Sequence, residues 1–362
     1  MPISAVDTLS PAFQHTKQQL LQPFRVGQWA KLALVGFLAG ELSSGGCNTS
    51  SFQLPTRTSG SQQLLDYGLR GIDPALYAGL IAVLIVAALV LGVLFLYVGS
   101  VMRFVLFDSI LAKSCEIRKS WGRRQGPGLR YFLWQILLLL GFLAGMIILV
   151  GIPAAFAFAA GWLKEPSRHT VPLVLGGMLL FMVLFAFVAC WFVVHVMTKD
   201  FVVPQMALED VSAMEGWRRF WPMLKTEKGG YAGYIGLKIV MAIGAAVLVS
   251  IISTIVILIL LIPVGGVGAV LVLGGKAAGL QWNLYTITLA VVVGTILVGL
   301  ILYVISLVSV PPIVFFPAYS IYFFASRYPA LQQLLYPAPP APVIPVATPP
   351  LPPPLPPPEP IG

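Results

Sequence analysis

Six apolar runs dominate the sequence, and each is long enough, or nearly long enough, to cross a lipid bilayer as a helix. The chain of 362 residues is 58% hydrophobic and only 10% charged. Soluble domains carry about 25% charged residues, so too few polar groups remain here to cover a globular surface. We therefore predict an all-α, polytopic integral membrane protein.

The predicted membrane domain covers residues 26–335 and holds about six transmembrane helices. The first apolar run is close to the lower limit of about 17 residues for a membrane span, while the second is longer than a bilayer requires. The predicted spans are 26–42, 74–107, 131–163, 172–198, 231–263 and 284–310.

Four further segments have compositions of their own. Residues 1–25 are predicted to form an amphipathic leader, and the apolar, glycine-rich stretch 264–275 to form either an interfacial loop or a re-entrant piece. Residues 313–335 are rich in Tyr and Phe, which is typical of a segment at headgroup level. Residues 336–362 hold nearly half of the 30 prolines and predict a disordered polyproline tail. That tail is either a spacer or a ligand for a protein partner.

The distribution of Lys and Arg predicts the orientation. With six spans and the N-terminus in the cytoplasm, 17 of the 22 Lys and Arg residues fall on the inner side. This satisfies the positive-inside rule for a prokaryotic inner-membrane protein with both termini cytoplasmic. The net charge of +9 lies beside apolar runs. It therefore favours anionic lipid headgroups, and not nucleic acid, as the partner.

The segment 211–224 has the pattern of an amphipathic helix on a membrane surface. Ser212 and Glu215 have the spacing of a capping box at its start. One predicted apolar face carries Met214, Trp217 and Trp221, and Arg218 and Arg219 point away from it. Trp and Met opposite Arg are typical of helices that lie in the plane of a membrane. The candidate lipid contacts are Trp121, Arg123, Arg124, Trp217, Arg218, Arg219 and Trp221.

The connectors resemble one another, which predicts three outward hairpins, each preceded by a surface helix. An acidic residue, Asp108 or Asp200, is followed by a Trp with two arginines, then by glycines and an aromatic return to the membrane. Two explanations remain open at this level. The chain contains an internal duplication, as some transporters do, or basic interfacial connectors share this composition for physical reasons alone.

Ionisable residues within or near the spans are candidate functional groups. All of them lie toward the ends of spans, where long side chains can reach the headgroups, so the middle of the membrane is predicted to be almost free of charge. The pair formed by Asp200 and Lys238 is predicted to be a screened surface pair. The candidates are Glu41, Arg103, His195, Asp200 and Lys238.

The sequence predicts no catalytic, cofactor-binding or metal-binding residues. The three cysteines, Cys47, Cys115 and Cys190, form no CxxC pair and fall at different predicted depths, so neither a disulfide nor a zinc site is expected. His195 is predicted to be an interfacial histidine, with a role as a ligand or proton relay as the alternative. Metalloprotease, nucleophile-elbow and EF-hand motifs are absent from the sequence.

Three motifs resemble an uncharacterised family of prokaryotic polytopic membrane proteins, similar in pattern to the membrane domain attached to some glycerophosphodiester phosphodiesterases. These motifs are Pro11-Ala12-Phe13 near the N-terminus, Gly216-Trp217-Arg218-Arg219-Phe220 in the central connector, and Pro317-x-Tyr319 near the end. The resemblance covers about residues 1–336 and implies no catalytic residues, because no phosphodiesterase domain is visible.

Three functional hypotheses follow. The leading one is a non-enzymatic inner-membrane protein whose basic surface helices contact anionic lipid or a partner. The second is a permease for a lipid-like or apolar solute, motivated by prolines that interrupt spans at Pro153, Pro263 and Pro311-Pro312. The third, a membrane-embedded enzyme acting on lipid headgroups, has the least support, because no convergent set of acid, base and metal ligands is visible.

Overall fold

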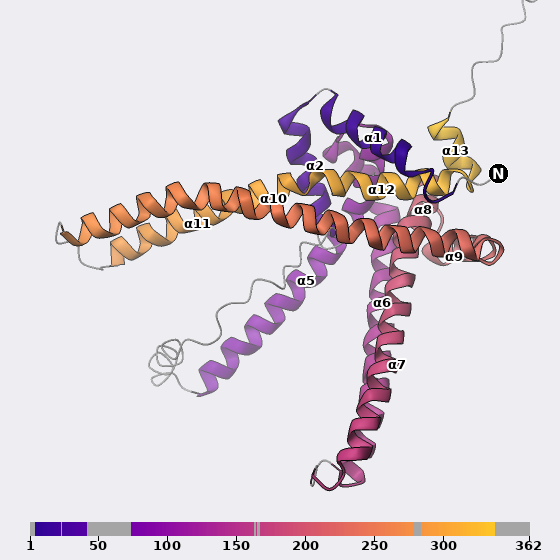
Figure 1. Ribbon diagram of the computed structural model, residues 1–362, viewed down its shortest axis with the longest axis horizontal. Coiled ribbons are helices and arrows are strands. Elements are labelled where there is room, and N and C mark those ends of the chain that lie inside the picture. Colours follow the sequence, from indigo (N-terminus) through magenta and orange to yellow (C-terminus); the bar gives the residue numbers. More distant parts are fainter. Residues whose placement is uncertain are drawn as a thin grey trace, which may run out of the picture.

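The computed structural model describes residues 4–22, 24–41, 74–162, 164, 167–277 and 284–336, and within these ranges the chain is helical with no strand (Figure 1). Residues 42–73, between the first two predicted spans, and residues 337–362 of the proline-rich tail lie outside the described residues. The helices are α1 Leu9–Leu21, α2 Val26–Leu38, α5 Pro74–Leu111, α6 Ile117–Ala159, α7 Thr170–Met197, the π-helical turn η2 Thr198–Val202, α8 Val203–Glu209, α9 Ala213–Thr226, α10 Lys228–Ala277, α11 Leu284–Val308, α12 Val310–Ala325 and α13 Pro329–Leu335.

Five helical segments are long and apolar enough to cross a membrane. The shortest has 34 residues, about 50 Å at 1.5 Å per residue, compared with about 30 Å of hydrocarbon. Their outward side chains are apolar and largely exposed, as in Ile147 at 71% and Leu179 at 68%. A water-soluble protein does not expose apolar surface on this scale, so these segments require a lipid environment. The segments are Ala78–Leu111, Ile117–Ala159, Thr170–Glu209, Lys228–Ile262 and Val291–Ala325.

The long helices form arms that leave one compact core (Figure 1). Helices α6 and α7 pack side by side in one arm, and α10 and α11 pack in a second. The N-terminal half of α5 projects between these two arms. The core therefore lies where the arms meet, and α1, α2 and α12 close it.

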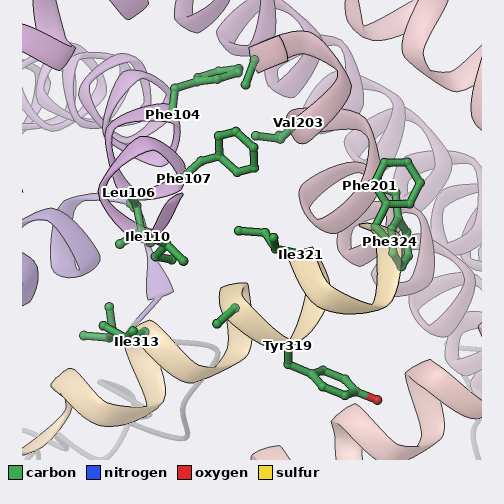
Figure 2. Close-up of a cluster of buried hydrophobic side chains, with 14 of the residues drawn as sticks. Phe104, Leu106, Phe107, Ile110, Phe201, Val203, Ile313, Tyr319, Ile321 and Phe324 are labelled. Atoms are coloured by element: carbon green, nitrogen blue, oxygen red, sulfur yellow. The ribbon is translucent and has the colours of Figure 1, made fainter. Parts of the chain in front are cut away.

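Three segments that lie far apart in the sequence make most of the core. The C-terminal end of α5, the η2–α8 segment and α12 bring their side chains together, and Phe107, Val203 and Ile321 point toward a shared space in Figure 2. Each of the three is no more than 5% exposed. Burying a side chain of this size contributes about 1.5–3 kcal/mol, so apolar packing at this junction holds the arms together.

The predicted first span differs from the structure. Helix α2 has only 13 residues, about 20 Å, which is too short to cross the hydrocarbon layer. Leu32, Ala33, Val35 and Gly36 are buried in the core instead. At Gly36 a methyl group would lie 2.4 Å from the Ile313 side chain, which shows how closely α2 approaches α12. The apolar run reflects contact with protein, which hydropathy alone does not distinguish from contact with lipid.

One other prediction was also wrong, and a second is refined by the structure. Helix α10 continues through 264–275 to Ala277, where we expected a loop or a re-entrant piece. Inside a bilayer every backbone N–H and C=O needs a partner within the chain, which outweighs the roughly 1 kcal/mol cost of each glycine. The aromatic segment 313–335 contributes Tyr319, Phe323 and Phe324 of α12, which are fully buried in the core, and its position at headgroup level stays a prediction.

Candidate functional site

Five charged side chains meet in the core beside the C-terminal end of α5, the η2–α8 segment and α12. Glu41 lies 2.5 Å from the Lys199 ammonium and 3.5 Å from the Arg103 guanidinium. Lys238 forms an ion pair with Asp200, which also accepts a hydrogen bond of 2.9 Å from the Tyr234 hydroxyl. These five charged side chains are 3–12% exposed. We call this set, Glu41, Arg103, Lys199, Asp200 and Lys238, the charged cluster.

Local backbone features place the members of the cluster. Gly40 has a positive φ of 75°, a left-handed conformation that ends α2 and turns Glu41 into the core. Lys199 and Asp200 lie in the π-helical turn η2, which interrupts the regular spacing between α7 and α8. Lys199 reaches Glu41 at the end of α2, while Asp200 reaches Lys238 on α10. Such π-turns within α-helices are frequent at functional sites.

The cluster contradicts two expectations from the sequence. Arg103 does not extend toward headgroups, because its Nη2 donates a hydrogen bond of 2.5 Å to the carbonyl of Ala39 inside the core. The Asp200–Lys238 pair is not a screened surface pair, since both side chains are at least 88% covered. Breaking a buried ion pair leaves an uncompensated charge, which typically costs about 3–5 kcal/mol. His195 is half-buried in the last turn of α7, within electrostatic range of Arg103.

A small cavity of about 30 Å³ separates the charged cluster from the apolar junction. One wall is polar, with Glu41, Arg103, Lys199, Asp200 and Ser320. The other wall is apolar and comes from the residues that converge in Figure 2, among them Leu106, Phe107, Val203 and Ile321. The volume is enough for one or two water-sized particles.

A second buried ion cluster fixes the connector between α5 and α6. The Asp108 carboxylate accepts hydrogen bonds from Nε and Nη2 of Arg124 at 2.8 and 2.6 Å, and from Nη2 of Arg123 at 2.9 Å. Arg124 also donates to the carbonyl of Ala207 in α8 at 2.6 Å and is only 14% exposed. Its donors therefore point into the protein. Arg123 is 65% exposed and can still reach a surface, whereas Trp121 is half-buried against the core.

Helix α9 begins as the capping box predicts, since the Glu215 backbone N–H donates to Ser212 Oγ at 3.3 Å. A second face, which carries Ala213, Gly216 and Phe220, packs against the core, and it is not the apolar face predicted for lipid. A methyl group at Gly216 would lie 2.7 Å from Val202 of η2. The small residues permit this close approach of α9 to the core.

The candidate lipid contacts on α9 divide into two groups. Trp217 is half-buried and donates from Nε1 to Thr198 at 3.0 Å, so it anchors α9 to η2. Arg219 bonds Glu215 at 3.0 Å and pairs with Glu209, and the Arg219 hydrogen bond is the main cause of the lowered pKa of the Glu215 carboxyl. Met214, Arg218 and Trp221 remain exposed. A shallow groove runs between them, lined by Met214, Trp217, Arg218, Trp221 and Pro222.

Within the described residues, Cys115 is buried, Cys190 is exposed and neither forms a disulfide. No group of His, Cys, Asp and Glu in these parts of the chain has the arrangement of a metal site. In the charged cluster each acid forms an ion pair with a lysine or an arginine.

The sequence model of one protein family matches residues 3–334, and its description is "Family of unknown function" (DUF7544). The chain belongs to this family. No curated protein and no solved structure matches the chain. The match covers every helix described above from α1 to α12, so membership in this family concerns the core and the arms together. The resemblance to membrane domains of glycerophosphodiester phosphodiesterases stays a prediction.

Sequence reasoning singled out four of the five members of the charged cluster but did not bring them together. Glu41 and Lys199 are 158 positions apart, and Arg103 and Ala39 are 64 apart. One usable signal was that both acidic members, Glu41 and Asp200, adjoin apolar runs, where an unpaired carboxylate is costly. That signal predicts that each acid has a basic partner, but it does not identify the partner residue.

Proposed function

We propose that this protein is a non-enzymatic, multi-pass protein of the prokaryotic inner membrane whose cationic helix α9 binds anionic phospholipid headgroups. In this proposal the core lies at the inner surface of the membrane with both termini in the cytoplasm, and α5, the α6–α7 pair and the α10–α11 pair extend outward from it as three arms. The uneven distribution of Lys and Arg along the sequence supports this orientation.

The exposed face of α9 is the observation that carries the proposal. Met214 is 62% and Trp221 50% exposed, and the Lys225 ammonium lies 5.4 Å from the Trp221 ring. Arg218 is 80% exposed at the edge of the same groove. Exposed Trp and Met beside cations suit the boundary between headgroups and acyl chains. Each cation near an anionic surface adds about 1 kcal/mol of attraction.

The test measures lipid binding by the full-length protein. Purified protein is offered phosphatidylglycerol or phosphatidylcholine, and bound lipid is counted by native mass spectrometry. We expect a preference for phosphatidylglycerol that falls about tenfold or more in the double variant R218Q/K225Q, because two cations contribute about 2 kcal/mol.

The charge-conserving variant R218K/K225R is the matched control and should keep the preference. The double variant M214S/W221S should weaken the binding of both lipids, since it removes apolar contact from the groove. Equal binding of the two lipids by the unaltered protein would contradict the proposal. Deletion of 336–362, followed by a comparison of captured proteins, tests separately whether the proline-rich tail binds a partner.

The permease hypothesis has less support. Its motivation was broken spans, but α6 continues through Pro153 and α10 through Pro263. Of the three predicted breaks, the one at Pro311-Pro312 is present, since α11 ends at Val308 and α12 begins at Val310. The cavity in the core, at about 30 Å³, is far smaller than a lipid-like solute. Reconstituted protein that released a trapped apolar solute from vesicles would restore this hypothesis.

A further inference from the structure

Helix α2 has two faces with different surroundings. Its inner face is buried in the core, as described above, whereas Leu34 and Phe37 on its outer face are 51% and 55% exposed. Val26 falls on the same outer face by helical spacing and is also exposed. The outer face of α2 therefore presents apolar side chains to the surroundings of the protein.

The charges of α2 lie at one end of the helix only. Arg25 at its N-cap and Lys31 in its first half are exposed, whereas residues 32–40 carry no charge. Phe37 follows Lys31 by six positions, which is about 9 Å along the helix axis. Cations followed along one helix by exposed apolar side chains have the same order as phosphates and acyl chains in a lipid leaflet.

The end of α2 lies where α5 leaves the core. A methyl group at Gly99 of α5 would lie 2.8 Å from the Leu38 carbonyl oxygen, so the two helices are in close contact there. On α5 the residues are exposed as far as Phe95 and buried from Ser100. In Figure 1, α2 runs from its turn with α1 toward the place where the arms leave the core. The apolar end of its outer face therefore lies next to the exposed apolar surface of an arm.

The length of α2 matches one leaflet. Its 13 residues extend about 20 Å, while one leaflet supplies about half of the 30 Å of hydrocarbon. Helix α2 also packs against α11, which belongs to another arm. Facing water, the outer face would enlarge the exposed apolar surface of these arms, which a soluble surface does not tolerate.

We propose that α2 is a half-membrane helix whose outer face contacts the acyl chains of the inner leaflet, with Arg25 and Lys31 at the level of the lipid phosphates. The core then lies partly within this leaflet. The proposal rests on the proposed function only in naming the inner leaflet. It does not involve α9, so the depth of α2 and the lipid preference of α9 are separate results.

The test measures the depth of spin labels on the full-length protein in vesicles of phosphatidylglycerol and phosphatidylcholine. The variants V26C, L34C and F37C each carry one nitroxide, in a background without the native cysteines. Collisions with oxygen, which concentrates among acyl chains, are compared with collisions with a nickel chelate, which stays in water. We expect the ratio of oxygen to nickel collisions to rise from V26C to F37C and to differ several-fold between them.

Two exposed positions calibrate this ratio. I147C on the α6 arm gives the value for acyl chains, and K119C on the connector between α5 and α6 gives the value for water. A ratio at F37C no higher than that at K119C would place α2 in water and overturn the proposal. Few collisions with either reagent would mean that protein covers this face, and would overturn it as well.

A second measurement uses the unaltered protein, so it does not depend on the folding of cysteine variants. A phospholipid with a photoreactive diazirine in the upper half of one acyl chain is reconstituted with the protein, and labelled residues are mapped by mass spectrometry. We expect label on Leu34 or Phe37 as well as on the α6 arm. Label on the arm without any on residues 32–38 would refute the contact.

Discussion

His15 illustrates how a single buried residue connects distant parts of this chain. Its Nε2 lies 3.0 Å from the Ile110 carbonyl, which can only accept, so Nε2 carries the proton. In the neutral ring Nδ1 then accepts from the Tyr322 hydroxyl at 3.1 Å. The side chain thereby joins α1 to the ends of α5 and α12. The neutral tautomer fits this position, and the charged ring does not.

Burial lowers the pKa of His15 below its usual 6.5, and the nearby Lys113 lowers it further, although hydrogen bonds to Ile110 and Gln19 oppose the shift. The unfolded chain therefore binds a proton more readily than the folded protein does. This contribution to stability is complete above pH 6.5 and is lost as the pH falls below that value.

We predict that lowering the pH from 7.5 to 5.5 reduces the Tm of the unaltered protein more than that of H15Q. The glutamine variant should be less stable at pH 7.5, because it packs less well, but its Tm should respond less to pH. Thermal unfolding followed by circular dichroism at both pH values measures the difference. Parallel pH responses of the two proteins would show that His15 does not titrate as described.

Individual residues also show the limits of sequence reasoning. Ser212 caps α9 as predicted, because its partner lies three positions away in the chain. Arg124 was predicted to reach lipid, but it bonds Asp108 and Ala207, 16 and 83 positions away. Short-range partners can be predicted from spacing, whereas partners from other helices cannot.

At the scale of the elements, close contact between α5 and α6 depends on a small residue. A methyl group at Gly128 of α6 would lie 2.7 Å from Val101 Cγ2 and 3.1 Å from its Cα. The second distance involves backbone, which cannot rotate away. Gly122 in the same helix has open space around the corresponding position and does not precede a proline. The two glycines therefore serve as a matched pair.

We predict that G128A lowers the free energy of unfolding by about 1–3 kcal/mol, because the helices must move apart. G122A should be neutral or stabilising by up to about 1 kcal/mol, since alanine favours the helix. Thermal or denaturant unfolding of both variants in the same detergent gives the comparison. Similar stabilities would show that the contact between α5 and α6 is loose enough to admit a methyl group.

Helix α9 also has features that the sequence predicted and contacts that it did not. The sequence correctly predicted an amphipathic helix at this place and its first turn. It placed Trp217 on a lipid-facing side, but Trp217 anchors α9 to η2, and the residues that face the core are smaller. Periodicity identifies a helix, while the neighbour that a face meets depends on segments elsewhere in the chain.

At the scale of the whole molecule, the long arms extend away from a core that gathers the connectors. The turn between α5 and α6 and the helix α9 belong to the core, whereas the end of α6 and the start of α7 lie at the far end of their arm (Figure 1). Lys164 falls between Ala159 of α6 and Thr170 of α7 in the sequence. Helix α6 alone has 43 residues, more than twice the number needed to cross a bilayer. The connectors and Lys164 are therefore separated by more than the membrane thickness.

We predict that single cysteines replacing Lys119 and Arg218, which are 83% and 80% exposed, react from the cytoplasmic side. A cysteine replacing Lys164 should react only from the opposite side. A membrane-impermeant maleimide applied to intact cells and to inverted vesicles provides the measurement, in a background without the three native cysteines. Labelling of K119C and R218C from opposite sides would refute the proposed orientation, in which all connectors of the core face the cytoplasm.

The sequence by itself determined that this chain is helical and has helices apolar and long enough to cross a membrane, because hydropathy and helical periodicity are local properties of neighbouring residues. It also determined the cap of α9. Only the tertiary structure decided that α2 packs in the core, that α10 continues to Ala277 and that Glu41, Arg103 and Lys199 share one cavity. These features depend on contacts between residues far apart in the chain, and the same apolar or charged residue type suits lipid, headgroup or protein equally well.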